Sequence, residues 1–137
     1  MAYSKFYDNF YAWRQGAKAS LLAVWRFKPS RIYGLGFIFL QLLAWFQVYF
    51  IYRNLAGDLL VLHYNVDFGI DLVDDPIRII SYPFFSLIIF LLNLTIAAVL
   101  SKHRDFQAYL HILLGAALVF GVFLNLALIF VYLINFR

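Results

Sequence analysis

The sequence of 137 residues contains no cysteine and no glutamate, and only 13% of its residues are charged. Without cysteine the chain forms no disulfide and holds no thiolate nucleophile, which excludes a disulfide-stapled secreted module and cysteine-based catalysis. A soluble domain carries about 25% charged residues, so the low charge also argues against an ordinary soluble fold. The hydrophobic content of 65% and the aromatic content of 21% instead indicate a small membrane protein.

Three stretches are long and apolar enough to cross a bilayer, whose hydrocarbon core requires about 20 helical residues. We expect these membrane spans at 32–52, 82–100 and 107–136. The segments between and before them are a basic, aromatic N-terminal segment, an acidic loop and a short loop, at 1–31, 53–81 and 101–106. The predicted fold is an all-α membrane protein with three transmembrane helices, an N-terminal amphipathic interfacial helix and a short structured extracytoplasmic loop.

Lys and Arg are divided unevenly between the two ends of these spans. Six precede the first span and two follow the second, whereas three lie in the regions that would face the other side. Because basic residues favour the cytoplasmic side, we expect a cytoplasmic N-terminus, an extracytoplasmic 53–81 loop and an extracytoplasmic C-terminus in the cell membrane. The basic residues expected at the membrane surface are Lys5, Arg14, Lys18, Arg26, Lys28 and Arg31.

The N-terminal segment has apolar residues at intervals of three or four. They are Phe6, Phe10, Trp13, Ala17, Leu21 and Val24. This spacing predicts an amphipathic helix within 3–28 that lies in the headgroup plane of the bilayer. A soluble arm that orders on a partner is the alternative. Pro29 is expected to end this helix, and Ser30 to cap the span that follows.

The 53–81 loop carries signals for a hairpin and for the start of a helix. An apolar run at 59–66 is too short to span, so it predicts a strand or a segment lying on the membrane surface. A turn is expected at 67–69 and a second short strand at 70–73. Asp75 followed by Pro76 is typical of an N-cap and a first helical residue, so the second span is expected to begin as early as Pro76.

The same loop holds the residues expected to contact a ligand or partner. They are His63, Asn65, Asp67 and Asp71. With Asp74 and Asp75, the carboxylates of this loop would suit a hard cation such as Ca²⁺, but their spacing is not that of an EF-hand. Solvated turn carboxylates are the favoured interpretation, and no metal site is expected.

Small and amide side chains recur inside the spans and are expected to mediate helix packing. They are Gln41, Asn93, Ala97, Ala117, Gly121 and Asn125. Amides are costly in hydrocarbon unless they are paired, so they are expected to face other helices and to share a hydrogen bond. A polar permeation path is the alternative. Packing is favoured because no Asp, Glu, Lys or Arg lies inside any span.

Candidate catalytic and cofactor residues are few. His103 and His111 would ligate a haem if they faced a cavity at depth, but both lie close to the predicted cytoplasmic boundary, so interfacial histidines are favoured. The chain has no Gly-rich phosphate loop and no evident Ser, His and acid set. We therefore expect no enzyme activity, no cofactor, no nucleic acid partner and no small-molecule substrate.

The residues Leu62, His63, Tyr64 and Asn65, followed by Gly69 and Asp71, lie between a first span and a span led by proline. This stretch resembles an outer-loop pattern of small bacterial membrane domains of unknown function, also found at the start of SdpI-type immunity proteins. The glycine is displaced by one residue, and the family's prolines before the histidine are missing. The resemblance implies a bacterial cytoplasmic membrane and an outer loop that meets an extracytoplasmic partner, with no catalytic residue.

The function expected from the sequence is that of a non-catalytic accessory or assembly subunit in the lipid bilayer. It would pack against other membrane protein subunits or against copies of itself, because three thin helices with small and polar stripes bury little alone. An extracytoplasmic sensor or immunity-type protein acting through residues 59–78 is one alternative. A small oligomeric channel or carrier is the other.

Overall fold

The computed structural model of the chain describes residues 2–55, 59–65, 67 and 69–136. The fold is mostly helical, and three long apolar helices follow an N-terminal helix, which confirms the predicted all-α membrane class. In chain order the elements are α1 (Ala2–Arg26), α2 (Lys28–Asn54), β1 (Leu60–Asn65), β2 (Gly69–Asp74), η1 (Pro76–Ile80), α3 (Ser81–Val99), η2 (Leu100–Lys102) and α4 (Phe106–Phe136).

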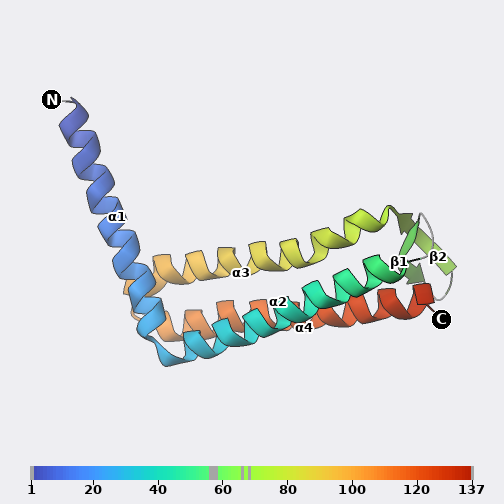
Figure 1. The fold of residues 1–137 in the computed structure, drawn as a ribbon. Helices are drawn as coiled ribbons and strands as arrows, with labels where there is room; N and C mark the ends of the chain where they lie inside the picture. The colour runs from blue at the N-terminus through green and yellow to red at the C-terminus, as the bar shows by residue number, and fades with distance from the viewer. Residues whose placement is uncertain (1, 56–58, 66, 68, 137) are drawn as a thin grey trace.

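Helices α2, α3 and α4 lie side by side and form an elongated bundle (Figure 1). Helix α4 packs closely against both α2 and α3, while α2 and α3 contact each other less. At one end of the bundle, α1 projects away from the turn that joins α3 to α4, and at the other end the β-hairpin covers the helix ends. The bundle therefore has two structurally different ends.

The boundary between α1 and α2 differs from the expectation. Phe27 is extended at φ −76° and ψ 114°, and Pro29 lies within the first turn of α2 instead of ending α1. Ser30, expected to cap the span that follows, donates its hydroxyl to the carbonyl oxygens of Val24 and, at 2.7 Å, of Phe27. The prediction of an N-cap was wrong because α2 begins at Lys28, so Ser30 already lies inside the helix, and its hydroxyl bonds carbonyl oxygens at the junction of α1 and α2.

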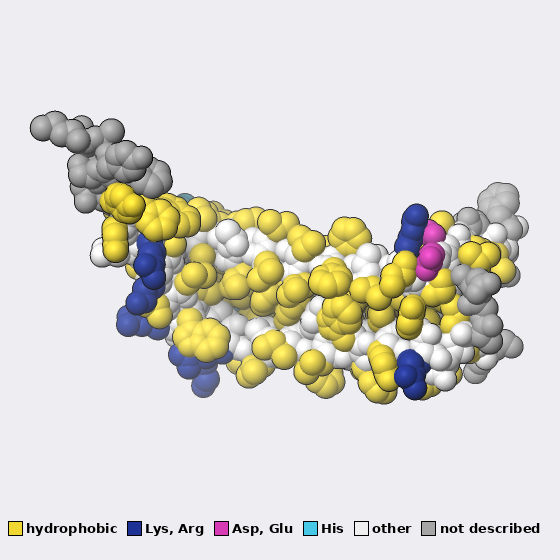
Figure 2. Space-filling view, turned by 45° about the horizontal axis from the view of Figure 1, so that its top comes forward, with side chains coloured by type: hydrophobic (Ala, Val, Ile, Leu, Met, Phe, Trp, Pro, Cys, Tyr) yellow, Lys and Arg dark blue, Asp and Glu magenta, His cyan; other side chains and the backbone are white. Residues whose placement is uncertain are grey.

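Three helices are long and apolar enough to cross a membrane, namely Lys28–Asn54, Pro76–Lys102 and Phe106–Phe136. Hydrophobic side chains cover the bundle along its length on the face shown in Figure 2. The most apolar 18-residue stretch of each span is only 22%, 17% and 33% buried, respectively. Such surfaces suit lipid or other helices, so the chain is a small multi-span membrane protein.

Strands β1 and β2 form an antiparallel hairpin, as the alternation of apolar and turn residues predicts. Gly69 begins β2 with a φ of +78°, a left-handed conformation that glycine adopts without steric cost. After the hairpin, Asp75 accepts a hydrogen bond from the amide of Ile77 at 2.8 Å, which confirms the predicted N-cap before Pro76. The short η1 helix then continues directly into α3.

Candidate functional site

A polar seam joins α2 and α4 in the middle of the bundle. Asn125 of α4 is 5% exposed, and its side-chain Nδ2 donates to the carbonyl oxygens of Gly121 at 2.8 Å and Leu40 at 3.2 Å. Its Oδ1 accepts a hydrogen bond from Nε2 of Gln47 at 3.1 Å. Asn125 therefore links its own helix to two points on α2.

The close approach of α2 and α4 depends on small residues beside this seam. Ala117 and Gly121 of α4 are buried, two turns and one turn before Asn125 on the same face. A Cβ atom on Gly121 would lie 3.2 Å from Cδ1 of Leu40, so a larger side chain would force Leu40 to move. The glycine thus lets the backbone of α4 approach α2 closely.

The two glutamines of α2 leave hydrogen-bonding capacity unused. Gln41 donates from Nε2 to the carbonyl oxygen of Pro83 at 2.8 Å and so connects α2 to α3. The Oε1 atoms of Gln41 and Gln47 are buried, and neither has a hydrogen-bond partner in the part of the chain that the structure describes. In hydrocarbon such an atom is costly, which makes both amides points where a donor from elsewhere would stabilise the protein.

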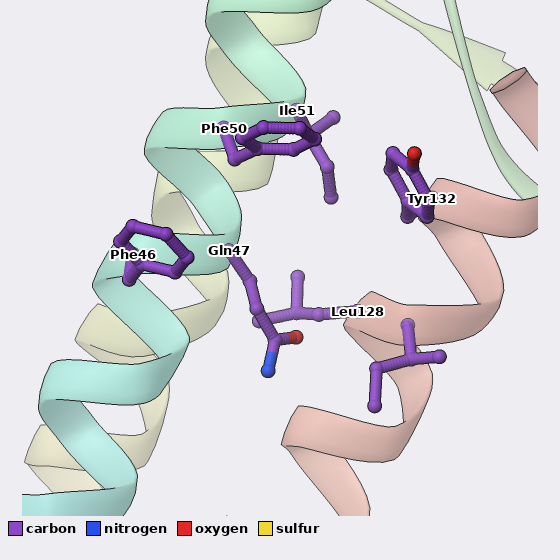
Figure 3. Close-up of a pocket in the computed structure, with 7 residues that line it drawn as sticks. Phe46, Gln47, Phe50, Ile51, Leu128 and Tyr132 are labelled. Atoms are coloured by element: carbon purple, nitrogen blue, oxygen red, sulfur yellow. The ribbon is translucent and has the colours of Figure 1, made fainter.

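An open groove of about 280 Å³ adjoins the seam between α2 and α4. Its walls are almost wholly apolar, and the residues that form it are Phe46, Gln47, Phe50, Ile51, Leu128, Ile129 and Tyr132. Figure 3 shows Gln47 and Leu128 extending toward each other from the facing helices, with Phe50 and Tyr132 further along the groove. The groove therefore combines aromatic walls with one amide.

The predicted packing residues of α3 are not part of this seam. Ala97 is fully buried, while Asn93 is half-buried and donates to the carbonyl oxygen of Ile89 in its own helix at 2.9 Å. The hydrogen bond between helices that we expected from the amide stripes thus comes from α2 and α4 through Gln47 and Asn125, and Asn93 takes no part in it.

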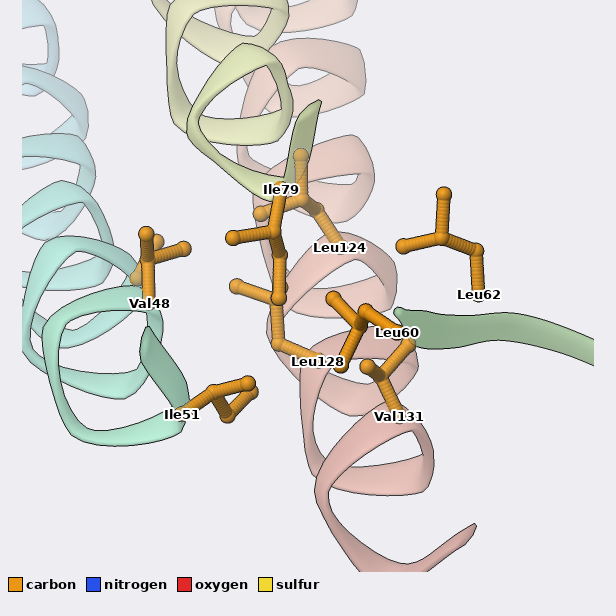
Figure 4. Close-up of a cluster of buried hydrophobic side chains, with 9 residues drawn as sticks. Val48, Ile51, Leu60, Leu62, Ile79, Leu124, Leu128 and Val131 are labelled. Atoms are coloured by element: carbon orange, nitrogen blue, oxygen red, sulfur yellow. The ribbon is translucent and has the colours of Figure 1, made fainter. Parts of the chain in front are cut away.

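The hairpin is attached to the end of the bundle through apolar and polar contacts. Leu60 and Leu62 lie among buried side chains of the three spans, including Ile79 and Leu128 (Figure 4). Asn135 of α4 accepts from the amide of Val61 at 2.9 Å and donates to its carbonyl oxygen at 2.8 Å. Our sequence interpretation missed Asn135, although it lies four residues after buried Val131 on the packing face of α4.

The predicted loop residues lie on this hairpin and its turn. His63 and Asp67 are exposed, while the side chains of Asn65 and Asp71 lie outside those that the structure describes. Asp74 forms an ion pair with Arg78, with Oδ2 and Nη1 2.7 Å apart. Across the described residues, no three His or Asp side chains are grouped so that they could hold a metal ion.

Basic side chains gather on and beside α1 in the view of Figure 2. The predicted membrane-surface residues Arg14, Lys18, Arg26, Lys28 and Arg31 are exposed, whereas the side chain of Lys5 is not among those described. Arg31 lies over the ring of Trp25, 5.5 Å from its centroid, and donates to the carbonyl oxygen of Trp25 at 2.8 Å. Exposed Trp13, Leu21 and Trp25 lie on the same helix, so α1 presents both cations and large apolar groups.

The two histidines considered for haem have protein partners near this end. His111 of α4 forms a 2.9 Å hydrogen bond through Nδ1 with the hydroxyl of Tyr33 on α2. His103 accepts from the amide of Asp105 at 3.3 Å, within the turn that joins α3 to α4. Both rings are therefore engaged in contacts that organise the α1 end of the bundle.

The most organised polar arrangement within the described spans is thus the α2–α4 seam with its groove, built from amides and small residues. Comparison of the chain with models of protein families, with curated proteins and with solved structures gave no match in any of the three.

Proposed function

We propose that the protein is a non-catalytic accessory or assembly subunit that binds other membrane protein subunits, or copies of itself, within the bilayer. The observation that carries this proposal is the open groove between α2 and α4. A side chain from a neighbouring helix would fill it, as a knob fills a hole in helix packing. Four residues of the groove, Phe46, Phe50, Ile129 and Tyr132, are 64%, 43%, 43% and 36% exposed.

The chemistry of the groove indicates what kind of helix it would accept. Its walls are apolar except for Gln47, whose Oε1 lacks a donor among the described residues. The amide of Gln47 has separate donor and acceptor atoms, so Oε1 would accept a hydrogen bond from a neighbouring helix while Nε2 keeps its bond to Asn125. A transmembrane helix with a hydroxyl or amide donor among apolar residues would satisfy both features.

Photo-crosslinking in native membranes tests the proposal. A photoreactive residue replacing Ile129, in the groove, should give a discrete protein adduct of defined mass. The matched position is Ile88 on α3, which is 50% exposed and does not line the groove. Equal adducts from the two positions, or lipid adducts alone together with a stable monomer on native gels, would contradict the proposal.

A second candidate function acts through the hairpin. Ile70, Leu72 and Val73 of β2 are 55%, 46% and 43% exposed, although Leu60 and Leu62 of β1 are buried. These exposed apolar side chains favour contact with an extracytoplasmic partner, as expected of a sensor or immunity-type protein. Replacing Ile70 and Val73 with Ser should then abolish the cellular phenotype at unchanged expression, and an intact phenotype would remove this candidate.

We also propose that the α1 end of the bundle faces the cytoplasm. Lys18 and Arg26 on α1 and Lys102 and Arg104 near η2 belong to this end, because α1 contacts η2. Such a concentration of cations is typical of cytoplasmic segments next to membrane spans.

A further inference from the structure

A second groove lies in the angle between α1 and α3, at the end of the bundle opposite the hairpin. Its volume is about 560 Å³, within the range of roughly 300–1,000 Å³ that small-molecule sites occupy. The lining residues are Arg14, Ala17, Lys18, Leu21, Leu22, Val24 and Trp25 of α1, with Leu94 of α3. The groove is therefore apolar inside, with two cations among its lining residues.

Packing at the base of α1 fixes the shape of this groove. Val24 is 3% exposed and belongs to a buried cluster with Ala98 of α3 and Leu110 and Leu114 of α4. The hydroxyl of Ser30 bonds the carbonyl oxygens of Val24 and Phe27, which ties the end of α1 to the start of α2. The last turns of α1 are thus joined to the bundle, and this packing holds the walls of the groove in place.

The charged side chains described around the groove are all basic. Arg14 and Lys18 line it, and Arg31 lies over the ring of Trp25, which forms part of its wall. No carboxylate is among the lining residues whose side chains the structure describes. Guanidinium and ammonium groups at the edge of an apolar groove are complementary to a ligand with an anionic head and an apolar tail.

We propose that this groove is a binding site for an anionic phospholipid. Arg14 and Lys18 bind the headgroup phosphate, and an acyl chain lies against Leu22, Trp25 and Leu94. Leu94 belongs to a helix that is apolar enough to cross the bilayer, so the tail enters the groove from the hydrocarbon side. A soluble phosphate would gain nothing from the apolar walls. The inference does not depend on the proposed assembly function, because the two grooves share no residue.

The position of Trp25 allows a direct test in the full-length protein. The chain has three tryptophans, so Trp13→Phe with Trp45→Phe leaves Trp25 as the single fluorophore. The protein is placed in nanodiscs of phosphatidylcholine that contain a small fraction of lipid with brominated acyl chains, which quench tryptophan at contact. We expect brominated phosphatidylglycerol to quench Trp25 more strongly than brominated phosphatidylcholine at the same mole fraction.

Matched variants separate a specific site from general attraction to a charged surface. A direct ion pair between an exposed cation and the headgroup phosphate strengthens binding by up to about fivefold, so Arg14→Gln with Lys18→Gln should lower the preference for phosphatidylglycerol by up to roughly 25-fold. Arg26→Gln with Lys28→Gln removes the same charge from exposed positions outside the groove and should leave most of the preference intact. Ala17→Phe narrows the groove without changing charge and should also weaken quenching.

Four results would overturn the proposal. They are equal quenching by the two brominated lipids, equal losses in the two charge variants, undiminished quenching in Ala17→Phe, and full displacement of the lipid by soluble glycerol phosphate. The last result would identify a soluble anion as the ligand. Variants are compared only as monodisperse protein with unchanged helical circular dichroism, and Ala17→Phe keeps the test available if a charge variant fails to fold.

Discussion

At the scale of single residues, the middle of the bundle depends on a few amides that satisfy one another incompletely. Asn125 uses its Nδ2 on two carbonyl oxygens and its Oδ1 on Gln47, whereas Oε1 of Gln47 has no partner among the described residues. Hydrogen bonds between transmembrane helices contribute modestly, from about 0.6 to 2 kcal/mol each. The hydrogen bonds of the seam therefore fix the rotation of α4 relative to α2, in addition to stabilising the bundle.

Replacing Asn125 with Leu should lower the free energy of unfolding by about 1–2 kcal/mol, because the substitution leaves Nε2 of the half-buried Gln47 without its acceptor. The measurement is reversible unfolding in mixed micelles of mild detergent and dodecyl sulfate. Asn93→Leu is the matched control, since Asn93 bonds only Ile89 of its own helix in the interactions that the structure records. A loss for Asn93→Leu as large as that for Asn125→Leu would contradict this account.

At the scale of elements, the hairpin and the last helix act as one unit. Asn135 presents an acceptor and a donor to the backbone of Val61, which mimics the pairing of a neighbouring strand. Leu60 adds an apolar anchor that is fully buried among the spans. These contacts hold the hairpin over the bundle although 74 residues of chain separate Val61 from Asn135.

Replacing Asn135 with Ala should loosen this attachment. We expect the amide of Val61 to exchange its hydrogen roughly 2- to 10-fold faster, which corresponds to loss of a hydrogen bond worth about 0.5–1.5 kcal/mol. Hydrogen–deuterium exchange of peptides covering β1 measures this directly. Asn54→Ala removes an amide that bonds only Phe50 in its own helix in the recorded interactions, and its effect on β1 should be negligible.

The elements themselves were predictable from the sequence, but their partners were not. The length of the apolar stretches predicts the three spans. The pair Asp75 and Pro76 predicts where the second span starts. Both signals are local in the sequence. Asn93 and Asn125 lie in similar stripes, yet only Asn125 bonds across helices in the described structure. Which face of α3 meets α4 depends on the rotation of packed helices, and spacing within one helix does not determine it. The prediction for Ser30 was wrong because α2 begins three residues earlier than an N-cap at Ser30 requires.

At the scale of the whole molecule, the two ends differ in charge and in structure. The α1 end holds the basic groove and the Tyr33–His111 hydrogen bond, while the hairpin end holds the ion pair of Arg78 with Asp74. The low burial of the span surfaces leaves most of each helix available to lipid or to other helices. Orientation in the membrane therefore decides which compartment meets the basic groove and which meets the hairpin.

The absence of cysteine makes this orientation directly measurable. We introduce Lys18→Cys, Lys102→Cys and Ile77→Cys one at a time and label intact cells with a membrane-impermeant maleimide. Ile77→Cys should react in intact cells, and the two lysine positions should react only after permeabilisation, because basic segments stay in the cytoplasm. Labelling of Lys18→Cys or Lys102→Cys in intact cells, with Ile77→Cys protected, would reverse the proposed topology.

The attachment of Val61 to Asn135 also sets an order of events during synthesis. A ribosome adds roughly 5–20 residues each second, so the hairpin waits about 4–15 s between its own emergence and that of the asparagine that holds it. During this interval its apolar side chains lack their α4 neighbours Leu124, Leu128 and Val131, and its strand edges are available to other chains. The growing protein is thus most exposed to insertion machinery, to chaperones or to a waiting partner before α4 arrives.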